Sequence, residues 1–504
     1  MDTQKTKAFF NKYGHVIWII ALAIVFITFC SKCSFIFPFN DWCDSNIYFT
    51  IGKSMVNGKV LYRDIFDHKG PYIFMLHSLA YLISNKSFLG VYFIEIPLAA
   101  LFCYSVYKLL LLYVEKRYAL LSLPVLAFVS YASLAFCHGD SAEEIVMPFM
   151  ALSLLHLFQF TKGQKLSLFK YAVAGIFTAI AFWIKFTLCG FFMGWILLAF
   201  IFEVKDKTVK HAFCGIGSFL GAFILSTLPV IIYFGVNKCF GDLFEVYFID
   251  NLFVYSKGTE GEIVSFLLKI GMPIWVYLRS FAYGLFFYIL LIPGFIYFAT
   301  SKEISRREKI ALFVTYALMN LLIFGGGRGG KYYGLPVCIF AFTGTVAAFK
   351  VRFTQKLCDK IVKRFILSTA VVSAVLFVLA PFVSPYRIET FKKKSELFQF
   401  QFAEIISEKQ DATILNYGTL DLGLYTVTGT VPECKYFFKP NIAISEIMQT
   451  HDEWVIEGKT DFVVLQGNPP EIIDIKYEQV AEKKQKYETK TRTYYLYRLK
   501  DLNK

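Results

Sequence analysis

The sequence lacks the motifs of several large protein classes. It contains no Gly-rich phosphate loop of the Walker type, so no ATP-driven motor is indicated. Its 11 cysteines include no CxxC with a matching partner pair, which argues against a zinc site. Charged residues make up only 18% of the 504 residues, whereas 56% are hydrophobic. A soluble protein cannot bury that much apolar surface, but a multi-pass helical membrane protein can, because lipid solvates its outer face.

The long apolar runs also lack the features of a cleaved leader or of a repeated transporter. No small-residue cleavage site follows the first run, which therefore reads as an uncleaved first span. No internal repeat is apparent, which argues against a transporter built from two related halves. The net charge of +14 is concentrated in short loops between apolar runs, so it predicts membrane orientation and not nucleic-acid binding.

Eleven apolar runs are candidates for membrane spans, and the loops between them alternate in charge. Loops rich in Lys and Arg are expected in the cytoplasm, together with the N-terminus, and the alternate loops outside. By parity, the C-terminus is then extracytoplasmic. The runs lie at about 15–30, 88–113, 119–137, 144–160, 169–185, 187–203, 212–235, 274–300, 310–325, 334–349 and 365–384.

The polar residues 386–504 predict a second, extracytoplasmic α/β domain after a membrane domain over 1–385. Strands are expected at "ATILNYG", "DFVVLQG" and "RTYYLYRL", and helices at "ISEIMQTHDEWVIEGK" and "EQVAEKKQKYE". The predicted fold class is an all-α polytopic membrane domain with this small domain at its end. Within the outer loop 31–87, the stretch "PYIFMLHSLAYLIS" predicts an interfacial helix, as does the aromatic and acidic segment at 236–272.

Ionisable side chains collect in the predicted outer loops. The segment "YRDIFDHKGP" holds five of them in ten residues, and two more acids precede it in the same loop. Other lysines of this loop, Lys53, Lys59 and Lys86, are expected to be solvated. The outer-face set consists of Asp41, Asp44, Arg63, Asp64, Asp67, His68, Lys69, His138, Asp140, Glu143, Glu144, Lys185, Arg328 and Lys331.

Acids and cations at the outer membrane boundary suit the chemistry of a lipid phosphate. The cations Lys69, Lys185, Arg328 and Lys331 are candidates to hold the phosphate. A nearby carboxylate would take a proton from an acceptor hydroxyl, and the lipid phosphate would be the leaving group. This combination predicts sugar transfer from a polyprenyl-phosphate donor.

Three stretches resemble a known family. "DSNIYFTIGKSMVNGKVLYRDIFDHKGP" resembles the first outer loop of GT-C-fold glycosyltransferases, especially bacterial relatives of protein O-mannosyltransferases and of the lipid A aminoarabinose transferase. "HGDSAEE" resembles their second outer loop, and "GGGRGGKYYGLP" resembles their late outer loop. The resemblance implies a multi-pass protein of a bacterial plasma membrane, with a lipid-linked sugar donor and an extracytoplasmic acceptor.

The resemblance also assigns roles to residues. The first-loop acid that acts as base corresponds to Asp44, with Asp41 as a nearby alternative, and the donor-phosphate lysine corresponds to Lys69. Either Arg328 or Lys331 takes a second phosphate role, since the late loop has no histidine before its tyrosines. The second-loop acid is Asp140, Glu143 or Glu144. The residues expected to stabilise the outer loops, without taking part in the chemistry, are Arg63, Asp64, Asp67, His68, Asp140 and Glu144.

The sequence is also compatible with a divalent cation at the site and with two other functions. Some GT-C enzymes employ a divalent cation such as Mg²⁺ or Mn²⁺, and Asp44 with Glu143 would supply oxygen ligands. A transporter or lipid flippase would need ionisable or broken-helix sites near the membrane midplane. A non-catalytic relative would bind the lipid and present its C-terminal domain to a partner.

The alternating loop charges generate a prediction about topology. A reporter fused after Lys504, or inserted near Asn57, should lie outside the cytoplasm, whereas one in the loop "SKEISRREK" should lie inside, because Lys and Arg are retained on the cytoplasmic side. Accessibility of each reporter to a membrane-impermeant reagent measures this. A cytoplasmic Lys504 would overturn both the eleven spans and the outer-face site.

Overall fold

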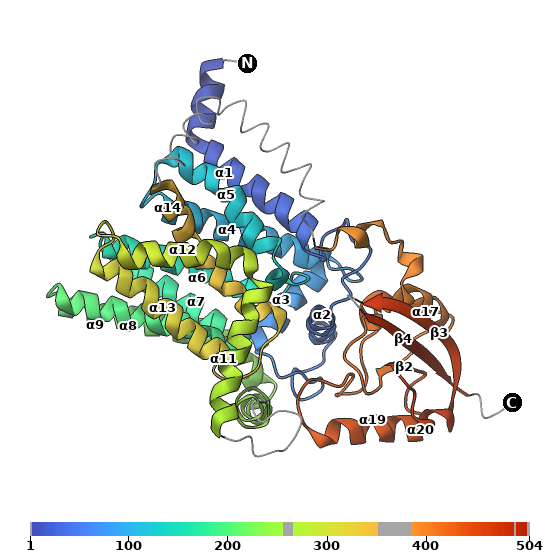
Figure 1. Ribbon diagram of the computed structural model, residues 1–504. Helices are drawn as coiled ribbons and strands as arrows, with labels where there is room; N and C mark the ends of the chain where they lie inside the picture. Colours follow the sequence, from blue (N-terminus) through green and yellow to red (C-terminus); the bar gives the residue numbers. More distant parts are fainter. Residues whose placement is uncertain (1–2, 256–265, 351–384, 488–489, 501–504) are drawn as a thin grey trace. The chain divides into compact units, whose positions relative to one another are not determined.

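The computed structural model describes residues 3–255, 266–350, 385–487 and 490–500 (Figure 1). The chain divides into two compact units, each assembled from segments that are distant in the sequence. The predicted outer loop is largely part of the same unit as the C-terminal residues, and a domain boundary after residue 385 stays a prediction. Unit 1 consists of Met1–Ser34, Tyr92–Pro229 and Val264–Arg387, and unit 2 consists of Phe35–Val91, Val230–Ile263 and Ile388–Lys504.

Unit 1 is built from long apolar helices that pack closely where glycines face a neighbouring backbone. A Cβ atom on Gly190 of α8 would lie 2.3 Å from Leu318 O of α13, and one on Gly344 of α14 would lie 2.0 Å from Leu290 O of α12. Small residues allow helices in lipid to approach each other in this way. The helices are α1 (Thr3–Cys30), α4 (Leu89–Leu110), α5 (Lys116–Tyr131), α6 (Ala142–Thr161), α7 (Leu168–Lys185), α8 (Cys189–Lys205), α9 (Val209–Val236, which continues into unit 2), α11 (Phe266–Tyr283), α12 (Leu285–Thr300), α13 (Arg306–Phe324) and α14 (Phe342–Lys350).

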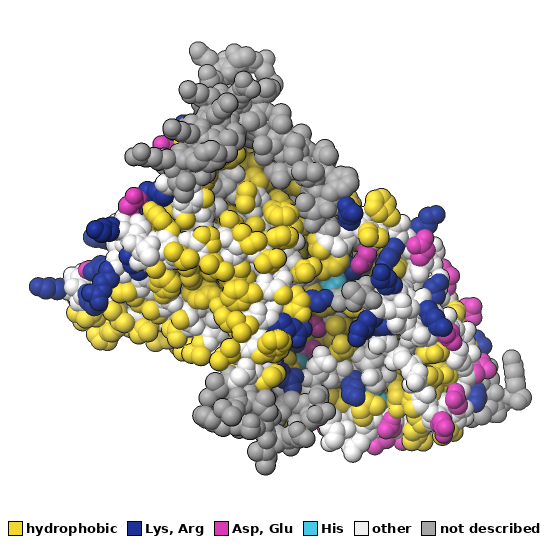
Figure 2. Space-filling view, viewed as in Figure 1, with side chains coloured by type: hydrophobic (Ala, Val, Ile, Leu, Met, Phe, Trp, Pro, Cys, Tyr) yellow, Lys and Arg dark blue, Asp and Glu magenta, His cyan; other side chains and the backbone are white. Residues whose placement is uncertain are grey.

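Several of these helices are long and apolar enough to cross a membrane, and Figure 2 shows hydrophobic side chains over a broad face of this unit. Five segments qualify within the described residues, or up to seven if each of two bent helix pairs is one span. The predicted number of eleven is therefore not confirmed, and the predicted span at 365–384 lies outside the described residues. The five are Lys12–Cys30, Leu89–Leu110, Ala142–Thr161, Leu168–Lys205 and Val209–Val236.

Local features explain the difference in number. The predicted spans at 169–185 and 187–203 become α7 and α8, which the three-residue 3₁₀ turn Phe186–Leu188 joins into one 38-residue apolar segment. The predicted span at 119–137 is the 16-residue α5, which ends at Tyr131 and contains Pro124. The bent pairs are α11 from Gly271 with α12, at 107°, and Lys331–Phe340 with α14, at 41°.

The first part of unit 2 holds two short helices of the predicted outer loop, α2 (Cys43–Val56) and α3 (Pro71–Ile83). They cross closely, since a Cβ atom on Gly52 would lie 2.6 Å from the His77 carbonyl carbon. Helix α3 is the stretch expected to lie in the membrane interface, and Pro71 occupies its first turn. It buries Phe74 and His77 and exposes Leu79 and Leu82 by 62% and 68%. This division between a buried and an exposed apolar side suits an interfacial helix.

The segment predicted as a helix at 236–272 is largely helical where the structure describes it, with a turn at 237–239 after α9. Phe240–Leu243 forms α10, and a π-helix follows over Phe244–Val254. The Asn251 side chain donates a hydrogen bond to His68 O at 2.7 Å, so this segment supports the charged part of the first outer loop.

One face of α2 is hydrogen bonded to a C-terminal segment, 421–426. The three residues that make these bonds are spaced at i, i+4 and i+7, which places them in one row along the helix. All of them are fully buried. Thr426 Oγ1 donates to Asn46 Oδ1 at 2.8 Å, Thr50 Oγ1 donates to Asp421 Oδ2 at 2.9 Å, and Lys53 Nζ donates to Tyr425 O.

The expectation that Lys53 is a solvated loop residue is therefore wrong, because the residue lies on α2 with none of its surface exposed. Burial lowers the pKa of Lys53 to about 7, the Asp421 carboxylate opposes this shift, and the Lys86 ammonium adds to it. Burial likewise raises the pKa of Asp421, against the hydrogen bonds from Gly423 N and Thr50. The pair thus shares a poorly hydrated space.

The C-terminal part of unit 2 is a four-stranded sheet with the strand order β1-β2-β4-β3. Strand β1 (Ile414–Asn416) is parallel to β2 (Phe462–Gln466), which is antiparallel to β4 (Lys490–Leu499). All three strands fall where they are predicted. The predicted helix around 444–459 is α19 (Ser445–Glu457), and the other helices are α17 (Phe398–Ile406), α18 (Leu424–Thr428) and α20 (Glu471–Asp474).

The helix predicted at "EQVAEKKQKYE" is wrong, because this segment is the edge strand β3 (Tyr477–Tyr487). It pairs antiparallel to β4 from Tyr477↔Leu499 to Tyr487↔Lys490, with an irregularity between Gln479 and Ala481. The pairing supplies the backbone hydrogen bonds that a helix would otherwise make internally. Lysines along an edge strand also hinder pairing with a further strand.

Candidate functional site

The charged segment Tyr62–Pro71 forms a fixed loop in unit 2. Tyr62 is fully buried with a φ of 68°, stacks on Phe234 with ring centroids 5.5 Å apart, and donates its hydroxyl hydrogen bond to Lys69 O. A non-glycine residue at positive φ is uncommon and needs such surroundings to hold it. The Tyr62 side chain therefore links the first residue of the loop to Lys69 near its end.

Arg63 and Asp64 form an ion pair on the outside of this loop. Arg63 Nε donates to Asp64 Oδ1 at 2.9 Å, and Val60 N donates to Asp64 Oδ2 at 2.8 Å. The hydrogen bond from Arg63 lowers the pKa of the Asp64 carboxyl. A further hydrogen bond, from Arg63 Nη1 to Asn237 O at 3.3 Å, attaches the pair to the end of α9. Because the pair is partly exposed, it contributes little to stability by itself.

Asp67, His68 and Lys69 lie on the inside of the loop. Asp67 and His68 are buried, and Lys69 N donates to Asp67 Oδ1 at 2.8 Å. The distance from His68 Nδ1 to the same oxygen is 3.5 Å, and Lys69 Nζ lies 3.5 Å from His68 Nε2. Burial raises the pKa of Asp67, the charge and amide of Lys69 lower it, and the Asp44 carboxylate raises it. The Asp44 and Asp67 carboxylates are therefore electrostatic neighbours.

The two first-loop acids face different surroundings. Asp44 is in the first turn of α2, where a helix N-terminus favours a negative charge. Asp41 precedes α2 and interacts with the sheet, since its charge adds to the effect of burial in raising the pKa of Tyr494 on β4. The Asp44 charge acts on Asp67 of the charged loop.

The second predicted outer loop is a tight turn in unit 1 that brings acids together. Three of the four positions from 137 to 140 adopt a left-handed backbone, since Cys137, Gly139 and Asp140 have φ values of 60°, 86° and 66°. Asp140 N donates to Glu95 Oε1 at 3.0 Å and to Glu144 Oε2 at 2.6 Å. All three acids are nine-tenths or more buried. Glu95 is absent from the predicted site, although "FIEIPL" shows an acid within an apolar run.

Glu143 and Lys185 form a buried ion pair in unit 1. Lys185 Nζ lies 2.6 Å from Glu143 Oε1 and 3.4 Å from the centroid of the Tyr333 ring. Within the part of the chain that the structure describes, Glu143 Oε2 has no hydrogen-bond partner, although the residue has no exposed surface. Lys185, predicted to hold phosphate, is thus engaged with an acid and an aromatic face, and Glu143 keeps one oxygen available as an acceptor.

Arg328 and Lys331 belong to the late loop of the same unit. Both are half-buried, and Lys331 begins the 3₁₀ helix Lys331–Phe340 that carries Tyr333. The structure therefore brings the late loop to the Glu143–Lys185 pair. Another buried cation, Lys32, was not predicted. Its ammonium lies 4.7 Å from the Tyr386 ring centroid, and its amide donates to His138 O at 2.8 Å.

The predicted site residues fall into both units. Asp41, Asp44 and the charged loop belong to unit 2, whereas Asp140, Glu143, Glu144, Lys185, Arg328 and Lys331 belong to unit 1. Among the described residues, no group of three or more His, Cys, Asp or Glu side chains is arranged to hold a metal ion. Asp44 and Glu143, the candidate ligands, lie in different units.

The Glu143–Lys185 pair generates a prediction about stability. Lys185→Met should destabilise the protein by about 3–5 kcal/mol, because it leaves the buried Glu143 charge unpaired. Adding Glu143→Gln to this variant should restore a large part of the loss. The midpoint of thermal unfolding in detergent measures both effects. As a control, Lys350→Met breaks the exposed pair with Glu303 and should change stability by no more than about 1 kcal/mol. Equal midpoints for Lys185→Met and Lys350→Met would contradict the prediction.

Comparison with known proteins identifies a family segment. Residues 68–233 match the family model described as dolichyl-phosphate-mannose-protein mannosyltransferase. The matched segment begins at His68 and includes both Glu143 and Lys185. No curated protein sequence matches the chain at a significant level.

Solved structures identify the fold. ArnT from Cupriavidus metallidurans bound to undecaprenyl phosphate has a TM-score of 0.53 at 12% identity, over 96% of this chain and 98% of ArnT. An Archaeoglobus fulgidus oligosaccharyltransferase tethered to an acceptor peptide has a TM-score of 0.47 at 14% identity, over 91% of this chain and 69% of that one. The AglB oligosaccharyltransferase of the same organism, with an inhibitory peptide and a dolichol-phosphate, has a TM-score of 0.45 at 13% identity, over 91% and 70%. The family segment and the ArnT fold together confirm the resemblance predicted from the outer-loop motifs, and the chain has the fold of the GT-C glycosyltransferases.

Proposed function

We propose that the protein is a membrane glycosyltransferase that moves a sugar from a polyprenyl-phosphate donor to an extracytoplasmic acceptor. The acceptor is a cell-envelope glycan, a lipid or a protein. Support comes from the matched family segment, the GT-C fold and, above all, the arrangement of Asp44 with the charged loop.

That arrangement carries the proposal. It combines an acid at a helix N-terminus with a buried acid, Asp67, that fixes the backbone of Lys69. The Lys69 carbonyl is held by Tyr62 as well, so both backbone polar groups of Lys69 are hydrogen bonded. A preorganised cation beside an acid is what transfer from a phosphate requires, since fixed charges stabilise a transition state without reorganising.

The proposed chemistry uses these residues in one displacement. The Asp44 carboxylate accepts the proton of the acceptor hydroxyl, and the acceptor oxygen bonds to the anomeric carbon of the sugar. The bond from that carbon to the phosphate oxygen breaks, and polyprenyl phosphate leaves with the electron pair. The Lys69 ammonium stabilises the charge that develops on the leaving phosphate.

Replacement of Asp44 tests the role of the base. Asp44→Asn should reduce turnover by at least ~100-fold, because it keeps the shape of the side chain but cannot take a proton. Mass spectrometry of the lipids that copurify with the protein identifies the donor, which then serves in the transfer assay. Asp64→Asn removes an acid of the same unit that is paired with Arg63, and it should have less effect. Full activity of Asp44→Asn would shift the base to Asp41 or Glu143.

Replacement of Lys69 tests the donor site. Lys69→Met should weaken the binding of undecaprenyl phosphate by about 2–5 kcal/mol, because a phosphate would be left unpaired in a poorly hydrated place. Lys69→Arg should keep part of the affinity, since the charge survives while its geometry changes. Titration of the purified proteins at one salt concentration measures this.

The matched control for Lys69 is Lys59→Met. Lys59 lies in the same outer loop but donates to Glu433 O of the C-terminal segment, so its loss should leave lipid binding unchanged. If Lys69→Met and Lys59→Met bind the lipid equally well, Lys69 does not hold the donor, and the phosphate role passes to Arg328 or Lys331.

A further inference from the structure

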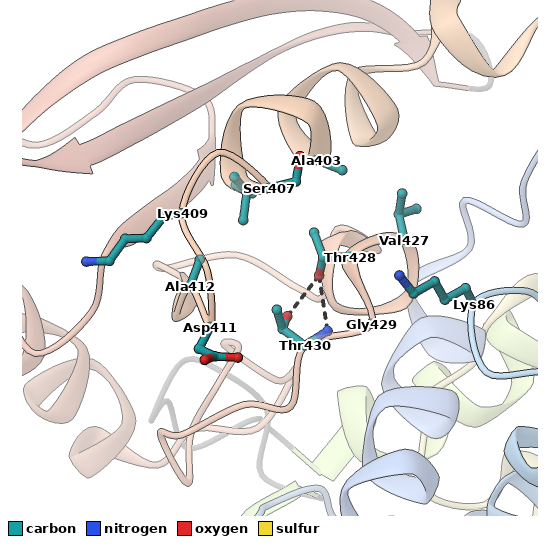
Figure 3. Close-up of a pocket in the computed structure, with 11 residues that line it drawn as sticks. Lys86, Ala403, Ser407, Lys409, Asp411, Ala412, Val427, Thr428, Gly429 and Thr430 are labelled. Carbon is teal, nitrogen blue, oxygen red and sulfur yellow. Dashed lines mark hydrogen bonds between the residues drawn. The ribbon is translucent and has the colours of Figure 1, made fainter.

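Unit 2 contains a solvent-open cavity of about 390 Å³ that none of the residues discussed for transfer lines. Its walls come from the end of α17, the turn before β1, the end of α18 with the residues that follow, and Lys86 after α3 (Figure 3). The volume falls within the range of small-molecule binding sites.

Lys86 forms one wall of this cavity. Its side chain is exposed, and it makes no hydrogen bond or ion pair with any residue that the structure describes. It lies across Gly429, where a Cβ atom would be only 2.9 Å from Lys86 Cε. Gly429 has a φ of 81°, which favours glycine at this turn. The absence of a side chain also leaves room for the Lys86 side chain. Figure 3 shows the Lys86 nitrogen directed toward residues 427–429.

A second lysine in the lining does not share this role. Lys409 Nζ pairs with Asp461 Oδ1 at 2.5 Å, and Figure 3 shows its nitrogen pointing away from the other labelled side chains. Lys86 is therefore the cation of the lining that is available to a ligand. It also lies near the buried Lys53, whose pKa it helps to lower, so the positive potential here is not due to Lys86 alone.

Hydroxyl groups and one acid supply the other polar atoms of the lining. Thr430 N and Thr430 Oγ1 lie 3.3 and 2.9 Å from Thr428 Oγ1, which fixes these two residues against each other. Ser407 is exposed on the α17 side. Asp411, at a φ of 52°, has no hydrogen bond or ion pair with any described residue. Its carboxylate accepts hydrogen bonds only, which suits the hydroxyl groups of a ligand.

The apolar part of the lining consists of small and medium side chains. Ala403, Ile406, Ala412 and Val427 provide it, and the lining contains no aromatic residue. Deep aromatic or aliphatic pockets usually anchor peptide side chains, and this cavity has none. Its ligand is therefore expected to be hydrophilic.

We propose that this cavity binds a saccharide that carries an anionic group. The Lys86 ammonium pairs with the carboxylate or phosphate of the ligand, and Asp411, Ser407 and Thr430 accept hydrogen bonds from its hydroxyl groups. The Thr428 hydroxyl is already bonded to Leu424 O and to Thr430, so it supports the wall of the cavity. The assignment of this saccharide to the acceptor rests on the proposed function, because a transferase needs to hold an acceptor glycan outside the reacting position. Binding itself does not depend on transfer.

The test is a titration of the full-length purified protein with three probes: D-glucuronate, D-glucose 6-phosphate and D-glucose. Saturation-transfer NMR or calorimetry reports affinity without any sugar transfer. The wild-type protein should bind at least one anionic probe more tightly than glucose. Lys86→Met should weaken that binding ~10-fold, the loss of one charge-assisted hydrogen bond, and remove the preference over glucose. Which anionic probe binds identifies a carboxylate or a phosphate as the recognised group.

Two further variants complete the test. Lys484→Met removes another exposed lysine, on β3 and outside the cavity, and should bind like the wild type. Asp44→Asn should also bind the anionic probe like the wild type. The binding test is therefore independent of the test of Asp44 as the base. The site is overturned if no probe shows saturable binding, if glucose binds as tightly as both anions, or if Lys86→Met keeps wild-type affinity for the anion.

Discussion

The row of buried hydrogen bonds between α2 and the segment 421–426 joins the first outer loop to the C-terminal part of unit 2. A lysine and an aspartate without contact to water are tolerated only when partners surround them, since an unpaired buried charge costs several kcal/mol. Lys53 and Asp421 meet this requirement with groups from both segments, and they are separated by about 370 residues in sequence. Helix α2 therefore has its present position because the C-terminal segment holds it.

The rest of unit 2 follows from this constraint. Asp44 lies in the first turn of the helix that Lys53 fixes, and the charged loop is tied to the C-terminal residues by a hydrogen bond from Phe66 N to Lys435 O at 3.1 Å. In unit 1, the buried acids are stabilised by different donors. There, one backbone amide is shared by Glu95 and Glu144, and Glu143 pairs with Lys185. In both units, acids near apolar surroundings are held by specific donors, as buried charges must be.

Local patterns in the sequence were sufficient to predict the apolar helices, three of the strands and the charged loop, because each depends on neighbouring residues. The prediction was wrong for β3, where charged residues spaced as in a helix form an edge strand paired with β4. It was also wrong for Lys53, whose burial depends on residues far along the chain. The pairing of Lys185 with Glu143 and the approach of Asp140 to Glu95 are likewise long-range features. The roles of the predicted site residues stay predictions.

The same row of hydrogen bonds has a consequence for biogenesis. During synthesis, α2 emerges early, but its partners at 421–426 follow only after the intervening helices, so Lys53 has no acceptor during most of translation. Contacts of such high sequence separation form late and slowly. The first outer loop should therefore reach its final structure last. In a chain stalled before residue 421, Asn46, Thr50 and Lys53 of α2 would lack these hydrogen-bond partners. The buried polar groups of α2 therefore obtain their partners only once residues 421–426 have been synthesised.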